Sequence, residues 1–173
     1  MSELIIRLAR EDEYDAVGTL TVAGYDADGY LRKADGSYDR DYASWLADGA
    51  TRGRDGELLV AAEGDELLGT VTWCPPGSPY RELAVRDDQG EFRTLSVAPH
   101  ARGRGIGRAL VADCLTRARS AGLTEMLLCS LNEMAPAHQL YASLGFVRRP
   151  ELDWSPYDGV DLWAFSLRLS AVA

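Results

Sequence analysis

Apolar residues recur along the chain at two different spacings, and these spacings predict a mixture of strands and helices. Short runs in which apolar residues alternate or follow one another predict strands, whereas apolar residues three and four positions apart predict helices that face a core. The expected strands are 4–8, 58–62, 67–73, 91–97, 126–129 and 160–169, and the expected helices are 11–24, 38–50, 106–118 and 135–144.

Turn-forming residues mark where these elements end. Residues 26–36 and 75–90 contain Gly, Asp and Pro and are expected to be loops, and Gly64-Asp65 predicts a hairpin turn. Gly145 suits the position just after a helix. The chain contains no repeat, no low-complexity tract and no linker, so residues 1–173 are expected to form a single domain.

The composition is that of a globular protein, with 46% hydrophobic residues and a net charge of -9. No apolar stretch approaches the roughly 20 residues of a membrane span, and Met1 to Leu4 do not resemble the start of a signal peptide. The three cysteines are widely spaced and odd in number, which indicates buried thiols in a reducing cytoplasm. With two histidines and no C-x-x-C, no metal site is expected.

The run from Arg102 to Arg108 reads RGRGIGR and lies where the strand 91–97 should lead into a helix. Unpaired N–H groups make the first turn of a helix partly positive, which normally favours Asp or Glu there. Residues 92–112 instead contain no acid, and their arginines are Arg93, Arg102, Arg104 and Arg108. A bound anion would satisfy both the arginines and the N–H groups, so this segment predicts a phosphate-binding site on an otherwise acidic protein.

Three familiar types of glycine-rich segment fit this run less well. A P-loop needs Gly-Lys-Ser/Thr, whereas Gly107 is followed by Arg108 and Ala109. A dinucleotide-binding fingerprint needs G-x-G-x-x-G on an early strand, whereas this run reads G-x-G-x-G in the second half of the chain. A simple turn with solvated arginines needs one glycine rather than three at alternate positions.

The remaining match is to a known family. Arg102-x-x-Gly105-x-Gly107 resembles the acyl-CoA signature R/Q-x-x-G-x-G/A of the GNAT superfamily of N-acyltransferases, and LSVAP at 95–99 resembles its L-x-V-x-P strand. LYASLGF at 140–146 resembles its second signature, L-Y-x-x-L-G-F. The two motifs stand in the family's order, and the resemblance covers nearly the whole chain.

This resemblance implies a GNAT-like α/β fold, with helices flanking a strongly twisted mixed sheet that is splayed between its fourth and fifth strands. The pantetheine arm of acetyl-CoA, the implied acyl donor, enters that splay. Many relatives have an asparagine seven residues before the tyrosine of the second signature; here that position is Met134, and Asn132 lies two residues earlier. The residues expected to bind acetyl-CoA are Leu95, Ser96, Val97, Arg102, Gly103, Arg104, Gly105, Ile106, Gly107, Arg108, Asn132 and His138.

Transfer of an acyl group from a thioester to an amine is helped by an acid near the sulfur. Tyr141 matches the family's tyrosine, whose hydroxyl approaches the sulfur, and is therefore the predicted acid. The alternative is that the ring of Tyr141 packs in the core with Leu140 and Leu144. For His138, one turn earlier, the alternative to lining the same channel is a capping or surface position.

The same reaction needs a base near the amine. Glu91 is the predicted base, because it opens the central strand where many relatives carry a glutamate that deprotonates the acceptor. Desolvation should then raise its pKa. The alternative is an exposed carboxylate at the end of a strand, paired with Arg93 or Arg81.

A covalent mechanism is not favoured by the sequence. Ser96 lacks the Gly-x-Ser-x-Gly context of a nucleophile, and Cys129 lies in an apolar run where a buried thiol behaves as a small hydrophobic residue. Direct transfer in a ternary complex is therefore expected.

The acceptor side is expected to contain Tyr25, Asp26, Trp45 and Trp154, because aromatic rings and carboxylates suit an organic cation. The predicted activity is N-acetylation of a small amine, or alternatively of a protein N-terminus or lysine. A non-catalytic acyl-CoA sensor is the alternative from another class, and it would not need Glu91 and Tyr141. The acidic net charge disfavours nucleic acid as a partner, and the sequence leaves a homodimer open.

Overall fold

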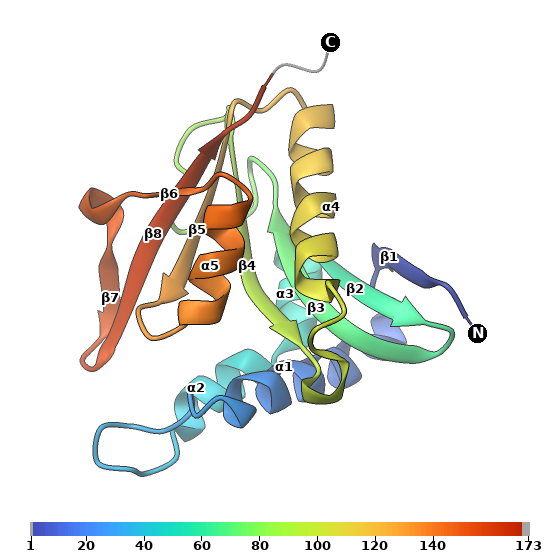
Figure 1. Ribbon diagram of the computed structural model, residues 1–173, viewed down its shortest axis with the longest axis vertical. Coiled ribbons are helices and arrows are strands. Elements are labelled where there is room, and N and C mark those ends of the chain that lie inside the picture. The colour runs from blue at the N-terminus through green and yellow to red at the C-terminus, as the bar shows by residue number, and fades with distance from the viewer. Residues whose placement is uncertain (1, 171–173) are drawn as a thin grey trace. The chain divides into compact units, whose positions relative to one another are not determined.

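The structure is a computed structural model in which residues 2–170 are described. Its strands and helices follow the expected order, with short elements added between them (Figure 1). The strands are β1 (Leu4–Leu8), β2 (Glu57–Glu63), β3 (Glu66–Cys74), β4 (Gln89–Val97), β5 (Glu125–Leu131), β6 (Val147–Arg148), β7 (Trp154–Tyr157) and β8 (Val160–Arg168). The α-helices are α1 (Tyr14–Ala27), α2 (Arg40–Ala47), α3 (Gly49–Asp55), α4 (Ile106–Ser120) and α5 (Ala135–Ser143), and the 3₁₀ helices are η1 (Glu11–Glu13), η2 (Pro99–Ala101) and η3 (Pro150–Leu152).

The strands form a mixed, eight-stranded sheet in the order β1-β2-β3-β4-β5-β8-β6, with β7 paired to β8, which confirms the expected α/β class. The β4–β5 pair is parallel, whereas β1–β2, β2–β3 and the pairs made by β8 are antiparallel. Strand β4 pairs with β5 only from Gln89 to Glu91. Such short pairing is consistent with a sheet splayed between these two strands.

The chain divides into two compact units. The first contains Met1–Trp73 and Thr94–Cys114, and the second contains Cys74–Arg93 and Leu115–Ala173. Strand β4 and helix α4 each contribute residues to both units.

In the first unit, close contacts between backbones hold α1 against its neighbours. A Cβ on Gly18 would lie 2.0 Å from the carbonyl oxygen of Ala47, so α1 and α2 can meet there only at a glycine. Figure 1 shows these two helices side by side. The buried guanidinium of Arg52 on α3 donates to the carbonyl of Leu46 at 2.7 Å and to the hydroxyl of Thr21 at 3.2 Å, which ties α3 to both helices.

In the second unit, β5 and β8 form the longest paired segment, from Glu125↔Arg168 to Leu131↔Leu162. Helix α5 lies against this pair (Figure 1). Side chains on successive residues of a strand point to opposite faces, so α5 covers one face of the pair, the face of Phe165.

The helix predicted over 38–50 is wrong as a single helix. It is interrupted at Asp48, whose carboxylate accepts from the N–H of Thr51 at 3.0 Å and from its hydroxyl at 2.6 Å. An Asp that bonds backbone N–H groups in this way caps a new helix rather than continuing an old one. The chain therefore turns at Asp48 and begins α3, which the apolar pattern did not predict.

Candidate active site

The predicted phosphate loop has the backbone geometry of an anion site. Gly103 and Gly105 have φ angles of 76° and 77°, which only glycine adopts readily, and an added Cβ on either would project into open space. Helix α4 begins directly afterwards, at Ile106, and no acidic residue lies in its first turn. The loop thus presents backbone N–H groups at a helix start without side chains in the way, which is the arrangement that binds phosphate.

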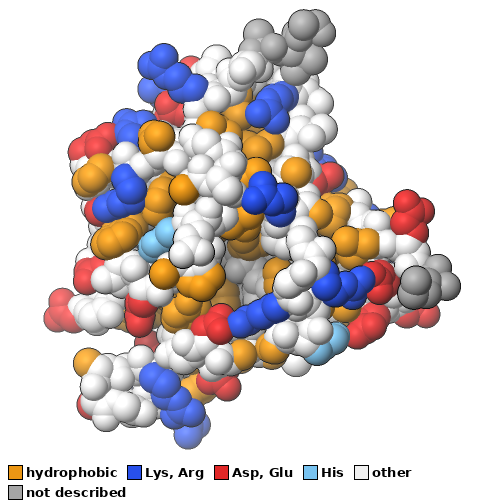
Figure 2. All heavy atoms as spheres, viewed as in Figure 1, with side chains coloured by type: hydrophobic (Ala, Val, Ile, Leu, Met, Phe, Trp, Pro, Cys, Tyr) orange, Lys and Arg blue, Asp and Glu red, His pale blue; other side chains and the backbone are white. Residues whose placement is uncertain are grey.

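The arginines of this loop have acidic neighbours in the structure. Arg102 donates to the carboxylate of Asp28 at 2.6 Å and to the carbonyl of Gly24 at 2.9 Å, and Arg104 is paired with Glu63. Figure 2 shows basic and acidic side chains interspersed over the face that it draws. The electrostatic potential around Arg102 and Arg104 therefore depends on these paired acids as well as on the net charge of the protein.

The end of β4 lies close to α1 in the same unit. The hydroxyl of Ser96 is buried and donates to the carbonyl of Thr21 at 3.4 Å, while Thr94 has a φ of 59°, which is unusual for a residue with a Cβ. A Cβ on Gly24 would lie 2.1 Å from the Ser96 hydroxyl. Ser96 thus packs as a structural residue; cofactor contacts by Leu95, Ser96 and Val97 stay predictions.

Tyr141 lies on α5 in the second unit and is 4% exposed. Its ring centroid lies 5.9 Å from that of Phe92, 6.0 Å from that of Phe146 and 5.8 Å from that of Phe165. These three rings fix the orientation of the phenol. The Tyr141 ring thus packs in the core, as the alternative interpretation expects, and its neighbours there are phenylalanines. The role of the hydroxyl as an acid stays a prediction.

His138 lies on α5 one turn before Tyr141, and Asn132 directly follows β5. The ring of His138 stacks on Trp163 with centroids 5.4 Å apart, and its Nε2 lies 3.0 Å from the carbonyl oxygen of Leu131. Burial lowers the pKa of His138, so the neutral ring donates to this carbonyl. Asn132 is exposed, and its N–H donates to the carbonyl of Asp161 at 3.0 Å.

Glu91 is a buried carboxylate, with no exposed surface. Its Oε1 accepts from the N–H groups of Glu82 at 3.0 Å, Leu83 at 2.7 Å and Ala84 at 2.9 Å. Burial raises the pKa of Glu91, while these N–H groups and Arg93 act in the opposite direction. The direction of the shift is the expected one, but the carboxylate is not the exposed strand-end group of the alternative interpretation.

Arg93 lies beside Glu91 in the second unit, whereas the arginines of the glycine loop belong to the first unit. Its side chain is 10% exposed, its guanidinium lies 4.8 Å from the ring centroid of Tyr80, and it donates to the carbonyl of that residue at 3.0 Å. It is also 3.8 Å from Glu91 and 3.7 Å from Glu82. This arginine therefore belongs to a buried polar cluster within the second unit.

Cys129 of β5 faces the same cluster. Burial raises the pKa of its thiol to about 11, although the charge of Arg93 lowers it in part. A thiol with such a pKa is almost entirely protonated at neutral pH and is a poor nucleophile. Direct transfer without an acyl-cysteine at Cys129 stays a prediction.

The residues predicted for the acceptor side fall into both units. In the first unit Tyr42 lies between Tyr25 and Trp45, with ring centroids 6.0 Å from each, and Trp45 is 41% exposed. Asp26 is exposed on the same helix as Tyr25. In the second unit Trp154 is half-buried on β7, near Cys129. Their role in acceptor binding stays a prediction.

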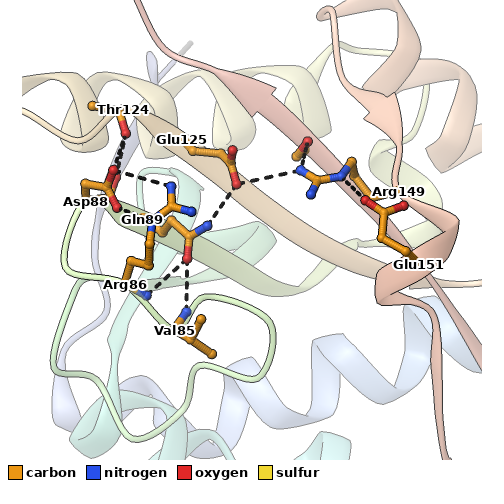
Figure 3. Close-up of polar contacts among 9 residues, drawn as sticks. Val85, Arg86, Asp88, Gln89, Thr124, Glu125, Arg149 and Glu151 are labelled. Atoms are coloured by element: carbon orange, nitrogen blue, oxygen red, sulfur yellow. Dashed lines mark hydrogen bonds and ion pairs between the residues drawn. The ribbon is translucent and has the colours of Figure 1, made fainter.

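A polar network ties the segment before β4 to β5 and η3 (Figure 3). The Oε1 of Gln89 accepts from the N–H groups of Val85 at 3.0 Å and Arg86 at 3.1 Å, and its Nε2 donates to Glu125 at 2.9 Å. Arg149 lies 3.8 Å from the same Glu125 carboxylate. The position of residues 85–89 is thus set from β5 as well as from β4.

Sequence reasoning missed the acidic partners in both units. Asp28 and Glu63 pair with the arginines of the glycine loop, and Glu82 pairs with Arg93. No motif contains these acids, and the two pairs at the glycine loop join residues 74 and 41 positions apart along the chain. The one available signal was the alternation of Glu91 and Arg93 on one face of a strand, which shows a polar face but not its partners.

The family comparison matches the description "Acetyltransferase (GNAT) family" over residues 25–146. Among curated relatives, the mycothiol acetyltransferase of Cellulomonas flavigena is 37% identical over 92 residues, which are 53% of this chain and 26% of that protein. The human N-acetyltransferase 8B is 37% identical over 87 residues, 50% of this chain and 37% of that protein. The chain thus spans well under half the length of these two relatives.

Solved structures share the fold over nearly the whole chain. The N-acetyltransferase paia of Thermoplasma acidophilum, solved with coenzyme A, has a TM-score of 0.70 at 16% identity and covers 96% of this chain and 99% of its own. The Salmonella typhimurium protein yncA, solved with its cofactor acetyl-CoA, has a TM-score of 0.63 at 21% identity and covers 98% and 96%. At these identities the likeness concerns the fold.

Within residues 2–170, no helix is both long enough and apolar enough to cross a membrane. Within the same residues, no group of three or more His, Cys, Asp or Glu side chains is placed to hold a metal ion.

Proposed function

The chain belongs to the acetyltransferase (GNAT) family, and from this premise we propose that it is an acetyl-CoA-dependent N-acetyltransferase that acts on an amine. The single observation that supports the proposal most is the loop of Gly103 and Gly105, whose left-handed backbone leads into α4. In this proposal residues 1–173 act as one N-acetyltransferase domain. Its widely spaced, buried or half-buried cysteines suit the cytoplasm.

The glycine loop fits the diphosphate of acetyl-CoA. An added Cβ on Gly103 or Gly105 would occupy the open space in which a phosphate would lie against the backbone. Arg102, Arg104 and Arg108 would supply positive charge, while Ile106 and Gly107 begin the helix. When bound, acetyl-CoA supplies the activated acetyl group, and the chain supplies binding, orientation and proton transfer.

We propose direct transfer without a covalent enzyme intermediate. The hydroxyl of Tyr141 gives a proton to the leaving sulfur, and three phenylalanine rings hold the phenol in place. The amine loses its proton to a carboxylate of the segment 82–91, for which the sequence predicts Glu91. The raised pKa of Cys129 supports this route over an acyl-cysteine.

For the acceptor we propose a small cationic amine. The net charge of -9 concentrates cations around the protein, and Tyr25, Asp26, Trp45 and Trp154 offer ring faces and a carboxylate. A peptide N-terminus or lysine is the second candidate, and a non-catalytic sensor of acyl-CoA is the candidate from another class. The rate should rise with pH on an acidic limb and fall with added salt.

Cofactor binding is tested by melting the protein with and without acetyl-CoA. A ligand at about 100 times its Kd adds about 2.7 kcal/mol of stability, so a domain of this size should melt about 5 °C higher or more. Gly107→Glu should abolish the shift, because it puts a side chain and a negative charge into the loop. Ala112→Glu, an exposed position on the same helix, adds the same charge and should keep the shift.

Catalysis is tested with acetyl-CoA and a panel of free amino acids, diamines, aminoglycosides, and peptides with a free N-terminus or a lysine. Thiol release measures turnover, and mass spectrometry identifies the N-acetyl product. No melting shift with any acyl-CoA would overturn the cofactor assignment. A shift without any acetylated product would favour the sensor.

A further inference from the structure

Five consecutive backbone amides before β4 are held by only two side chains of that strand. Glu91 accepts from the N–H groups of Glu82, Leu83 and Ala84 at 2.7–3.0 Å, and Gln89 accepts from those of Val85 and Arg86 at 3.0 and 3.1 Å. Figure 3 shows the two bonds to Gln89. Residues 82–86 therefore form a fixed segment whose position depends on β4.

The carboxylate of Glu91 is engaged in the hydrogen bonds that hold this segment. Its Oε1 accepts three N–H groups, its Oε2 lies 3.2 Å from the N–H of Glu82, and the residue has no exposed surface. A proton taken up by Glu91 would weaken bonds to three amides, which are strongest when the acceptor is ionised. A general base must also come within hydrogen-bond reach of the amine, either directly or through one water molecule.

Glu82 lies at the start of the same segment and differs from Glu91 in exposure. Its side chain is 44% exposed and lies 3.7 Å from Arg93, which is 3.8 Å from Glu91 on its other side. The charged or titratable groups facing Glu82 are Arg93 and Glu91 from β4 and the thiol of Cys129 from β5, with Tyr80 next to Arg93. A single buried arginine thus links one buried and one exposed carboxylate.

The two faces of β4 separate this cluster from Tyr141. Phe92 points toward the tyrosine, with ring centroids 5.9 Å apart, so its neighbours Glu91 and Arg93 point to the opposite face. An acid that protonates the leaving sulfur and a base that deprotonates the attacking amine act on opposite sides of the reacting carbonyl. The face that carries Glu82 is therefore suited to the base.

We infer that Glu82 is the carboxylate that receives the proton of the acceptor amine, and that Glu91 is a positioning residue that holds the segment 82–86 in place. This inference rests on the proposed N-acetyltransferase function. It assigns to an unpredicted residue the role that the sequence predicted for Glu91.

The proposed step is balanced in atoms and charge. Glu82 takes the proton of the acceptor's ammonium group and passes it to solvent. The nitrogen of the resulting neutral amine bonds to the carbonyl carbon of the acetyl thioester, and the carbon–sulfur bond breaks with its electron pair going to sulfur, which takes the hydroxyl proton of Tyr141. The nitrogen gives its second proton to solvent, and solvent returns one proton to Tyr141, which leaves an N-acetyl amine, a free thiol and one released proton.

The test compares pH profiles of kcat/KM for Glu82→Gln, Glu91→Gln and a control, Glu151→Gln. Glu151 is an exposed carboxylate paired with Arg149 in the same unit. The substrates are acetyl-CoA and the amine of the panel with the highest rate. Glu82→Gln should lower kcat/KM about 100-fold or more and move the acidic limb toward the amine's own pKa of about 8 to 10. Glu91→Gln and Glu151→Gln should keep the limb.

Hydrogen exchange tests the positioning role without any substrate. Glu91→Gln should speed exchange at the amides of residues 82–84, whereas Gln89→Ala should speed it at residues 85 and 86. If Glu91→Gln does not fold, Glu91→Asp keeps the charge and shortens the side chain, and the same amides are followed. Unchanged exchange at residues 82–84 would overturn the positioning role.

The outcomes separate this inference from the function on which it rests. If the acidic limb of the kcat/KM profile disappears in Glu91→Gln and persists in Glu82→Gln, Glu91 is the base and the assignment of Glu82 is wrong. A limb unchanged in Glu82→Gln, with normal acetyl-CoA binding, would overturn the assignment of Glu82 alone. Failure of the unaltered protein to acetylate any amine would overturn the proposed function, and this inference with it.

Discussion

The guanidinium of Arg102 donates to the carboxylate of Asp28 at 2.6 Å, which fastens the first residue of the glycine loop to the end of α1. Arg102 also donates to the carbonyl of Gly24 at 2.9 Å. Both partners of the ion pair are more than a third exposed, so the pair by itself adds little to stability. The ion pair instead fixes the position of the Arg102 guanidinium against the end of α1.

We expect Arg102→Ala to weaken acetyl-CoA binding about tenfold or more, because a charged hydrogen bond to phosphate is lost. Asp28→Asn should bind acetyl-CoA at least as tightly as the unaltered protein, because it lets the guanidinium turn to the ligand. Calorimetric titration measures both Kd values. An unchanged Kd in Arg102→Ala, with a lower Tm, would mean that Arg102 only fastens α1.

Tyr141→Phe should lower kcat and kcat/KM together by about tenfold or more, since it removes a hydroxyl that acts only in the transition state. The contacts with Phe92, Phe146 and Phe165 are kept, so Tm and the Kd of acetyl-CoA should change little. Tyr14→Phe, whose ring packs against the core of the first unit, is the matched control. Full turnover in Tyr141→Phe, with chemistry rate-limiting, would make Tyr141 a packing residue.

Cys129→Ala should keep turnover within about threefold, because direct transfer needs no thiol nucleophile. With a pKa of about 11, roughly one Cys129 thiol in three thousand is ionised at pH 7.5, so iodoacetamide should react far more slowly than with a free cysteine derivative. Mass spectrometry of the protein mixed with acetyl-CoA checks the same point. An acetylated Cys129 peptide that disappears on adding amine would contradict direct transfer.

Glu13→Gln should destabilise the protein by roughly 2 kcal/mol at pH 7. Glu13 is buried, Arg7 donates to both of its carboxylate oxygens at 2.8 Å, and this bond lowers its pKa from 4.5 to about 2. A lowered pKa adds stability above the unfolded value, and that stability is lost as the pH falls from about 4.5 to 2. The variant should lack this acid-dependent loss.

Urea unfolding at pH 7, 4 and 2.5 measures the effect of Glu13→Gln. Glu11→Gln, an exposed carboxylate in the same 3₁₀ turn, is the control and should change stability by less than about 0.5 kcal/mol. An equal loss of stability in the two variants at pH 7 would show that the contacts with Arg7 add nothing specific.

Local patterns were sufficient for the elements that make the glycine loop. Gly103 and Gly105 adopt positive φ angles and α4 begins at Ile106, as the run of glycines before an apolar helix pattern predicts. Glycine placement and helical spacing act over a few residues, so they can be read from neighbours in the chain. The break at Asp48 was not predicted from the spacing of apolar residues. There the Asp48 carboxylate accepts a backbone N–H and starts a new helix, and the spacing of apolar residues does not show which Asp will do so.

The sequence by itself determined the family, the order of the main strands and helices, and the position of the glycine loop, because each is expressed in short motifs or periodic spacing. The tertiary structure alone decided that Glu91 is buried beneath three amides, that Arg93 joins it to Glu82, and that Arg102 faces Asp28. Burial and charge pairing depend on which distant segments meet in the folded chain. The ionisation and accessibility that distinguish a base from an anchor are therefore properties of the fold and not of the motif.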